Sequence, residues 1–344
     1  MKNKAAVMTA VQQMEVQETE MPVMGEDDVL IEVENVGICG SDMLFFEHGR
    51  IGAKVAVPPF ILGHEASGTV KETGKNVMNL KAGDKVAVEP GVPCGHCKHC
   101  LSGRYNICET LTFCGTPPVN GLYRKYITHP AQWVHKLPEG MDTETGALIE
   151  PLAVGVHAVK MGEVGFGKTV LILGSGCIGL MSLFAARQMN ADRIIVVDLF
   201  EKRLQKAKDL GADVVINASE RDTMEAVREI TDGQGADVVL ETAGNPKTAY
   251  QATQLVARGG TVVQVGTLPN DLNYNVRAME VHEACLKLIW RYCNDFPTAI
   301  RMAANDPEGL SKVVTDRFEL ENIQEGFLKA MHEKQDVIKA VIRL

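Results

Sequence analysis

The sequence predicts an α/β protein with two domains, one β-rich and one built on a doubly wound parallel sheet. The chain has 344 residues, enough for two cores, and 45% of them are hydrophobic. From about Met161 onward, short apolar segments alternate with helical ones, as they do in parallel sheets. Before that point β-type segments alternate with turns, and residues 29–36 have the pattern of a half-exposed strand.

The two domains are predicted to interleave along the chain. The first takes residues 1–155 and is completed by 291–344, because the β-like end at 337–344 suits a strand added to its sheet. An amphipathic segment at 322–333 precedes that strand. The second domain takes residues 156–290. Its expected strands are 170–173, 193–197, 213–216, 237–241, 261–266 and 286–290, with helices at 178–189, 201–210, 224–231 and 247–257.

A glycine-rich turn follows the first strand of the second domain. Gly174, Gly176 and Gly179 have the spacing G-x-G-x-x-G between that strand and a helix. The first glycine permits the turn, the second lets a pyrophosphate approach the backbone, and the third allows close helix packing. Free N–H groups at the start of the helix would bind the phosphates. The motif predicts a dinucleotide site, and a glycine turn without a ligand is the alternative.

Asp198 favours the dinucleotide interpretation and indicates which cofactor binds. It follows the second strand, about 20 residues beyond Gly179, where a ribose-binding carboxylate is expected. Such a carboxylate accepts hydrogen bonds from the ribose hydroxyls and repels a 2′-phosphate. The sequence therefore predicts NAD rather than NADP, bound beyond the carboxyl ends of the strands.

Composition and charge argue against several classes of protein. No apolar run reaches about 18 residues, so no transmembrane helix is expected, and the N-terminus does not resemble a signal peptide. A net charge of −9 argues against a nucleic-acid partner and suits a soluble protein that acts on small molecules. With nine cysteines and no secretory signal, we expect metal binding rather than disulfides, and a reducing, cytoplasmic compartment.

The sharpest metal signal is a group of four cysteines with the spacing C-x₂-C-x₂-C-x₇-C. Its members are Cys94, Cys97, Cys100 and Cys108. Four thiolates at short loop spacing suit a closed tetrahedral zinc site, which would stabilise a loop without taking part in chemistry. A redox dithiol and an iron–sulfur cluster are weaker alternatives. His96 and His99 lie between the cysteines and are interpreted as facing solvent.

A second candidate metal site is dispersed along the first domain. Its residues lie on separate segments flanked by glycine or proline: Cys39, His64, Glu65 and Glu150. Alone, a cysteine is more often a small buried hydrophobe, and a histidine or glutamate is more often structural. Together, thiolate, imidazole and carboxylate are groups that Zn²⁺ accepts, and a catalytic zinc keeps one position open. The set is consistent with a catalytic zinc site, and a structural role for each residue is the alternative.

Taken together, these segments resemble the zinc-dependent medium-chain dehydrogenases and, among them, the sorbitol (polyol) dehydrogenases. The resemblance covers nearly the whole chain, most distinctively at 37–42, 49–52, 62–68, 103–106, 147–154, 174–179 and 291–294. It implies a GroES-like catalytic domain, a Rossmann domain and a homo-oligomer, as a tetramer or a dimer. The implied reaction transfers a hydride from a secondary hydroxyl of a polyol resembling sorbitol, iditol or xylitol to NAD, giving a ketose.

The resemblance also implies roles for individual residues. Cys39, His64 and Glu65 would hold the catalytic zinc, while Glu150 would hold a water there or take a turn as ligand. The four-cysteine group would hold a structural zinc, which some members lack. Residues expected near the polyol are Phe45, Glu150, Arg291 and Tyr292. Residues expected at the NAD site are Gly174, Gly176, Ile178, Gly179, Asp198, Arg203, Val265, Gly266, Thr267, Ile289 and Trp290.

Four residues near Cys39 bear on proton transfer and substrate contact. Ser41, two residues beyond Cys39, is placed to accept the proton of the substrate hydroxyl, and a turn hydroxyl is the alternative. Many polyol dehydrogenases have histidine and tyrosine where this chain has Leu44 and Phe45, so a substrate-side hydroxyl and a proton relay are missing. His48 is a candidate substitute for the relay.

Two other functions compete with polyol oxidation. A more apolar pocket at Leu44 and Phe45 favours a zinc-dependent dehydrogenase of simple secondary alcohols or hydroxy amino acids. A non-enzymatic zinc protein that binds a partner or nucleic acid is the second alternative. The net charge of −9 and the complete set of expected zinc ligands count against the latter.

Overall fold

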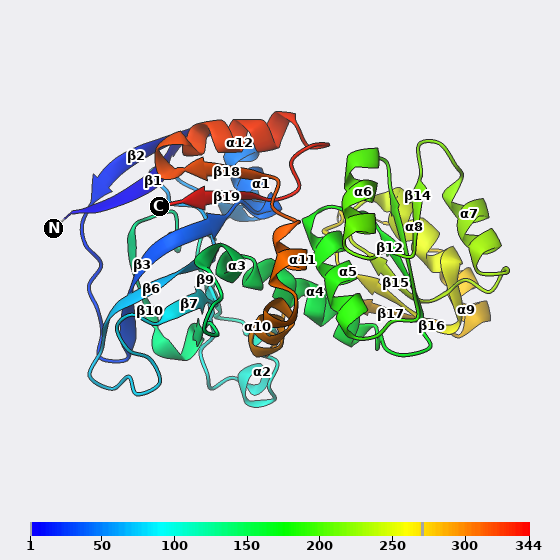
Figure 1. Cartoon of the computed structure of the whole chain (residues 1–344), viewed down its shortest axis with the longest axis horizontal. Coiled ribbons are helices and arrows are strands. Elements are labelled where there is room, and N and C mark those ends of the chain that lie inside the picture. Colours follow the sequence, from blue (N-terminus) through cyan, green and yellow to red (C-terminus); the bar gives the residue numbers. More distant parts are fainter. Residues whose placement is uncertain (1, 270–271) are drawn as a thin grey trace. The chain divides into compact units, whose positions relative to one another are not determined.

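The computed structural model describes residues 2–269 and 272–344, which form two compact units (Figure 1). Unit 1 comprises Met1–Glu150, Ala303–Pro307 and Val314–Leu344. Unit 2 comprises Pro151–Met302 and Glu308–Val313. The observed boundaries differ from the expected ones at two places. The first boundary between the units lies after residue 150 rather than 155, and residues 291–302 belong to unit 2 rather than unit 1.

Unit 1 is built on a seven-stranded sheet that is mostly antiparallel. Six strands lie in the order β11-β7-β6-β3-β19-β18, and β10 also pairs with β3. Because β19 pairs antiparallel with β3, the C-terminal strand is part of this sheet. The strands are β3 (Asp28–Gly37), β6 (Glu65–Thr73), β7 (Lys85–Val88), β10 (Tyr126–Pro130), β11 (Val134–Lys136), β18 (Asp316–Glu319) and β19 (Ala340–Arg343).

Strand β3 shows why this part of the chain forms a sheet around an apolar core. Its burial alternates along the strand, with Val29, Ile31 and Val33 each 0% exposed and the intervening side chains half-buried. A period of two places one face in the core and the other towards solvent. The sequence pattern at 29–36 is thus explained by a strand with one buried face.

Short ribbons and helices complete unit 1. The ribbons pair β1 (Asn3–Ala10) with β2 (Gln13–Thr19), β4 (Arg50–Ile51) with β5 (Lys54–Val55), and β8 (Gly91–Val92) with β9 (Thr112–Phe113). The helices are α1 (Gly40–His48), α2 (Lys98–Leu101), α3 (Thr143–Ala147) and α12 (Ile323–His332), with short 3₁₀ turns at Tyr105–Ile107, Ala131–Trp133 and Leu320–Asn322.

Unit 2 contains a six-stranded sheet in which all neighbouring strands are parallel. The order is β14-β13-β12-β15-β16-β17, so the first strand is central and the chain winds outward in both directions (Figure 1). This arrangement confirms the predicted doubly wound sheet. Its strands are β12 (Thr169–Leu173), β13 (Arg193–Asp198), β14 (Val214–Asn217), β15 (Ala236–Glu241), β16 (Val256–Gln264) and β17 (Cys285–Leu288).

The central strands of unit 2 are buried on both faces. Val170, Leu171, Ile172 and Leu173 of β12 are each 0% exposed, which explains the continuous apolar run in the sequence. The connecting helices are α5 (Cys177–Gln188), α6 (Glu201–Asp209), α7 (Thr223–Ile230), α8 (Pro246–Leu255) and α9 (Val276–His282). Among the described residues, no helix is both long and apolar enough to cross a bilayer.

Side-chain contacts explain why residues 291–302 belong to unit 2. Helix α4 (Ile149–Met161) carries His157, whose Nδ1 lies 2.8 Å from a carboxylate oxygen of Asp295. In α5, the Gln188 side chain donates to the Met302 carbonyl at 2.8 Å. These bonds hold α10 (Phe296–Asn305) to unit 2 as far as Met302. The chain then belongs to unit 1 from Ala303 and returns to unit 2 within α11 (Pro307–Ser311).

A buried histidine in unit 1 predicts acid destabilisation below pH 6.5. Burial lowers the pKa of His129 to about 4 from the ordinary 6.5. The unfolded chain therefore binds a proton that the folded chain does not, so stability is complete above pH 6.5 and falls as pH is lowered towards 4. At about 1.4 kcal/mol per pH unit, we expect a loss of about 2 kcal/mol between pH 6.5 and pH 5.

Urea unfolding of wild type and the His129→Gln variant across this pH range tests the prediction. The variant, which keeps a donor for the Glu89 carbonyl that lies 2.9 Å from Nε2, should show a flatter pH profile. Exposed His332 provides the control variant His332→Gln. A wild-type profile as flat as that of His129→Gln would contradict the assignment.

Candidate functional site

Two neighbouring strands bring Cys39, His64 and Glu65 together. Cys39 follows β3 and is the N-cap of α1, while His64 immediately precedes β6, which begins at Glu65. Because Gly37 pairs with Glu65 in the sheet, the end of one strand meets the start of the other. A Cβ atom at Gly37 would lie 2.0 Å from a Glu65 carboxylate oxygen, so only glycine fits beside this side chain.

The donor atoms of these three residues form a compact set. The Cys39 sulfur, a His64 ring nitrogen and a Glu65 carboxylate oxygen all lie within 4.8 Å of one another. Small side-chain rotations would bring such atoms to the spacing of about 3.5 Å that tetrahedral zinc ligands have. Glu150 is buried but lies outside this set. The residues present therefore fit a zinc ion held by Cys39, His64 and Glu65.

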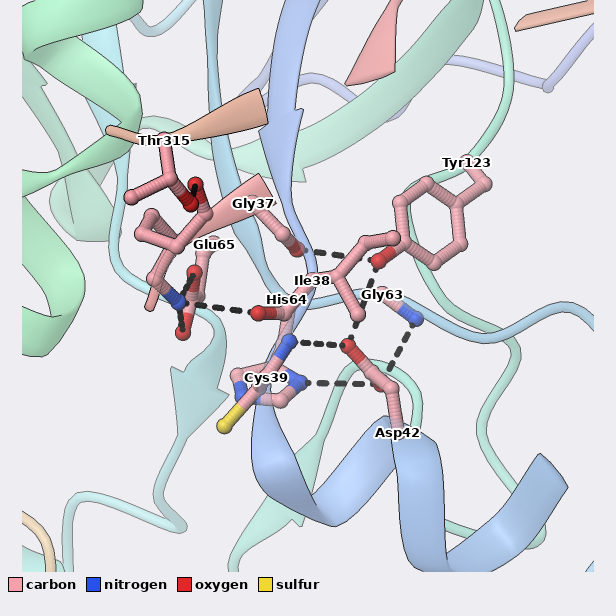
Figure 2. Close-up of polar contacts among 10 residues, drawn as sticks. Gly37, Ile38, Cys39, Asp42, Gly63, His64, Glu65, Tyr123 and Thr315 are labelled. Carbon is pink, nitrogen blue, oxygen red and sulfur yellow. Dashed lines mark hydrogen bonds and ion pairs between the residues drawn. The ribbon is translucent and has the colours of Figure 1, made fainter. Parts of the chain in front are cut away.

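Asp42 holds both ligand-bearing segments in place, as Figure 2 shows. Its carboxylate accepts the backbone N–H groups of Cys39 and Gly63, each at 3.1 Å, and lies 3.4 Å from Nδ1 of His64. This contact orients the imidazole and leaves Nε2 for a metal. Burial alone lowers the pKa of His64, but the nearby Asp42 and Cys39 charges outweigh it and hold that pKa well above its ordinary value.

Tyr123 supports Asp42 from the opposite side (Figure 2). Its hydroxyl donates to the Gly37 carbonyl at 2.9 Å. It also lies 3.3 Å from the Asp42 oxygen that accepts the Cys39 N–H. Burial first, and then the negative charge of Asp42, raise the pKa of Tyr123 well above its usual range, so this phenol stays a donor. Asp42 and Tyr123 are site residues that the sequence analysis missed.

Lys339 is the third site residue that the sequence analysis missed. Its ammonium group donates to both oxygens of Glu65, at 2.8 and 2.7 Å, and to the Ile38 carbonyl at 2.9 Å. The Lys339 and Glu65 side chains are only 2% and 1% exposed. Glu65 is thus a buried, fully paired carboxylate, and a metal at this position would share it with Lys339.

The other residues expected near the substrate occupy different environments. Ser41 is half-buried in the first turn of α1, two residues from Cys39. Phe45 is 3% exposed and packs in the hydrophobic core of unit 1, so its ring is a core side chain. Leu44 is 39% exposed, and the His48 side chain is 61% exposed. In unit 2, Tyr292 is buried against Phe296 and Arg291 lies over the Trp290 ring at 5.3 Å.

The four-cysteine group forms a second set of donor atoms in unit 1. The sulfurs of Cys94, Cys97, Cys100 and Cys108 lie within 4.8 Å of one another. Two of the distances are 3.5 Å, between Cys97 and Cys100, and 3.9 Å, between Cys94 and Cys100. Sulfurs on a tetrahedral zinc with bonds of about 2.3 Å lie about 3.8 Å apart. Backbone N–H groups of His96 and Cys97 lower the pKa of Cys94 to about 6, which favours a thiolate.

Loss of one of these thiols should remove one metal ion and loosen this segment. We expect Cys97→Ser to reduce bound zinc from two ions per chain to one and to lower Tm, because a three-thiolate site no longer closes around the ion. Elemental analysis and thermal unfolding of the purified protein measure both effects. The exposed Cys285 provides the control Cys285→Ser, and equal zinc contents in the two variants would contradict the assignment.

In unit 2 the glycine turn lies at the carboxyl end of the central strand β12. Gly174 has φ of +101° and packs against Ala243, and a Cβ on Gly179 would lie 1.9 Å from the Gly174 carbonyl oxygen. A Cβ on Gly176 would meet nothing nearer than Arg203 at 3.7 Å, so this backbone is accessible to a ligand. Ile178 lies in the first turn of α5, which begins at Cys177.

Asp198 lies at the end of the neighbouring strand and is bonded to the glycine turn. Its carboxylate accepts the N–H of Ser175 at 2.6 Å and those of Leu199 and Phe200 at 2.8 and 3.0 Å. Since a carboxylate has about four acceptor positions, capacity is left for a ribose hydroxyl. Arg203 lies over the Phe200 ring at 5.3 Å, on the next helix.

The remaining residues expected at the NAD site follow β16 and β17. The backbone N–H groups of Val265 and Gly266 each donate to the Glu241 carbonyl at 2.9 Å, and Gly244 lies against Thr267. The Glu241 carboxylate is 0% exposed and accepts from the N–H groups of Ala243 and Gly244 and from Gln264. Ile289 and Trp290 follow β17, so these residues, like the glycine turn and Asp198, lie at the carboxyl ends of parallel strands, whereas Arg203 lies on α6.

Comparisons with known proteins identify the family of the chain. Residues 25–139 match the alcohol dehydrogenase GroES-like domain, and residues 177–305 match the zinc-binding dehydrogenase family. The chain is 44% identical to an uncharacterised zinc-type alcohol dehydrogenase-like protein of Escherichia coli, over 100% of this chain and 99% of that one. It is 41% identical to a sorbitol dehydrogenase of Bacillus subtilis, over 98% and 96% of the two chains.

A solved structure extends the comparison to the fold. An Escherichia coli oxidoreductase/dehydrogenase of unknown specificity superposes with a TM-score of 0.95 at 43% identity, over 100% of this chain and 99% of the other. These matches make the protein an NAD(P)-dependent alcohol or polyol dehydrogenase rather than a non-enzymatic zinc protein. The chain belongs to the zinc-dependent medium-chain dehydrogenases, with sorbitol dehydrogenases among its relatives.

Proposed function

We propose that the protein oxidises a secondary hydroxyl of a polyol, using NAD as hydride acceptor and giving a ketose. The observation that carries this proposal is the Cys39, His64 and Glu65 donor set, within 4.8 Å, in a chain 41% identical to a sorbitol dehydrogenase. When bound, zinc supplies a Lewis acid that makes the substrate hydroxyl easier to deprotonate.

This chain's own residues orient the substrate and move its proton. Cys39, His64 and Glu65 hold the metal, while buried Glu150 orients a water or the substrate hydroxyl. Ser41, two residues beyond Cys39 in the first turn of α1, accepts the hydroxyl proton and releases its own hydroxyl proton to solvent water. Arg291 and Tyr292 contact the polyol chain. Hydride then passes to the nicotinamide, whose dinucleotide is held at the glycine turn.

Asp198 makes NAD the preferred cofactor. The carboxylate would face the ribose with negative charge, and a 2′-phosphate there is repelled. We expect kcat/KM for NAD to exceed that for NADP by about 100-fold, which corresponds to about 3 kcal/mol. Asp198→Asn should reduce this ratio about tenfold or more, while Asp192→Asn, which changes an exposed carboxylate at the start of the same strand region, should not. Equal use of both cofactors by wild type would contradict the prediction.

Two further properties complete the proposal. Strand β17 lies at the edge of the six-stranded sheet, with Leu288 68% exposed, and could extend the sheet into a second copy to give a dimer or, by further association, a tetramer. Nine cysteines as thiols suit a reducing compartment, which we take to be the cytoplasm. No nucleic-acid or membrane partner is proposed.

A substrate panel tests the proposed function. Sorbitol, iditol, xylitol, simple secondary alcohols and hydroxy amino acids are offered with NAD, NADH absorbance is followed, and zinc is quantified in the same samples. Polyols should give the highest kcat/KM, and removal of zinc should abolish turnover. Turnover that persists in the zinc-free protein would overturn the mechanism.

A simple secondary alcohol is the second candidate substrate. Leu44 is 39% exposed where many polyol dehydrogenases have a histidine. Phe45, on the buried face of α1 that also carries Asp42, lacks the hydroxyl of the tyrosine that often follows. Fewer polar groups near the site favour a less hydroxylated substrate. A higher kcat/KM for secondary alcohols than for every polyol in the panel would select this function.

A further inference from the structure

A buried carboxylate follows the segment 291–294 that carries Arg291 and Tyr292. Asp295 is 1% exposed. One oxygen lies 2.8 Å from Nδ1 of His157, and the other accepts from the Lys160 ammonium at 3.1 Å. His157 and Lys160 are three residues apart on α4, so both side chains reach the same side of that helix.

The same carboxylate also binds the backbone of the segment 291–294. The oxygen that faces His157 also accepts the backbone N–H of Cys293 at 2.9 Å. Arg291 and Asn294 have φ of 56° and 59°, a left-handed conformation that non-glycine residues rarely adopt. Such backbone persists where surrounding contacts hold it. Asp295, the next residue, supplies one of these contacts through the Cys293 N–H and connects the segment to α4 through His157.

Asp295 remains charged in this position. Burial raises the pKa of its carboxyl, but the His157 contact, the Cys293 N–H and Lys160 outweigh burial and hold that pKa below the ordinary value. A buried carboxylate without such partners would be strongly destabilising. The pairing therefore makes a rigid connection between α4 and the segment, next to the ring contact of Tyr292 with Phe296 at 5.2 Å.

We propose that Asp295, held by His157 and Lys160, is a positioning residue that fixes segment 291–294 for polyol binding, which rests on the function proposed above for Arg291 and Tyr292. Asp295 does not contact the polyol itself and acts by positioning Arg291 and Tyr292. Ile289 and Trp290 adjoin the segment, but the glycine turn and Asp198, which would hold the pyrophosphate and ribose, lie on other segments of unit 2. Removing the charge of Asp295 should therefore weaken polyol binding more than cofactor binding.

Steady-state kinetics of Asp295→Asn test this role. We expect KM for the best polyol to rise about tenfold or more, because small displacements of a positioning group have effects of this size. We expect kcat to change less than KM, and the dissociation constant of NADH, from fluorescence titration, to stay within about twofold of wild type. The control is Asp316→Asn, which removes the charge of a half-buried carboxylate whose side chain is 11% exposed and paired with Lys329 at 2.6 Å in unit 1.

Two more variants make the result decisive. His157→Gln should raise polyol KM in the same direction, and combining it with Asp295→Asn should add little, because both act through one contact. If Asp295→Asn does not fold, His157→Gln alone decides. An unchanged polyol KM, or an equal rise in the NADH dissociation constant, would overturn the proposal.

A third variant, Arg291→Ala, separates this proposal from the proposed function. If Arg291→Ala leaves polyol KM unchanged, the proposed substrate contact fails. If Arg291→Ala raises KM while Asp295→Asn does not, only the role of Asp295 fails.

Discussion

Substitution of Lys339 by methionine is expected to lower the free energy of unfolding of the zinc-free protein by about 3–5 kcal/mol. The two Glu65 oxygens accept from Lys339 at 2.8 and 2.7 Å, and both side chains are almost completely buried. Methionine has a similar length but no charge, so it leaves Glu65 as a buried carboxylate without its cation. Urea unfolding of chelator-treated wild type and variant measures the loss.

Bound zinc should reduce this loss, because it supplies Glu65 with another positive charge. We therefore expect the difference between Lys339→Met and wild type to be smaller in zinc-loaded protein than in zinc-free protein. The control is Lys329→Met, which removes a more exposed ion pair with Asp316 and should cost about 1 kcal/mol or less with or without zinc. Equal losses in both states of Lys339→Met would show that zinc does not interact with Glu65.

The sequence predicts best what lies close together along the chain. The four cysteines fall between residues 94 and 108, so their spacing alone indicates one site, and the structure gathers their sulfurs. The apolar runs of unit 2 predict the strands because parallel strands are buried on both faces. The start of α1 also had a readable signal, because Asp42 lies at the third helical position after Cys39 and its carboxylate accepts the Cys39 N–H.

Contacts between distant residues were not readable in the same way. Lys339 lies 274 residues from Glu65. In the sequence it is only one cation in a C-terminal segment with the pattern of a strand. His157 and Asp295 are 138 residues apart, and their contact explains why residues 291–302 pack with unit 2. Phe45 was expected near the substrate because of the family's tyrosine. The spacing of the buried residues Asp42, Phe45 and Phe46 identifies the inward face of α1, so Phe45 shares that face with Asp42, and its place near the substrate stays a prediction.

Replacement of Cys39 by serine is expected to reduce kcat/KM by about 1,000-fold or more. A serine hydroxyl is a poor substitute for a thiolate, and losing a Lewis acid that contributes several kcal/mol in the transition state has an effect of this order. NADH binding, measured by fluorescence titration, should be unchanged, because the glycine turn and Asp198 belong to unit 2 and Cys39 to unit 1.

Comparison of Cys39→Ser with Cys97→Ser separates the two metal sites. Each variant should contain one zinc per chain, but the first should lose turnover with little change in Tm, and the second should lose Tm more than turnover. The reason is that Cys39 lies in a set stabilised without metal by Asp42, Tyr123 and Lys339, whereas the four-cysteine segment depends on its thiolates. If Cys39→Ser retained two zinc ions and wild-type turnover, Cys39 would not be a ligand of the catalytic metal.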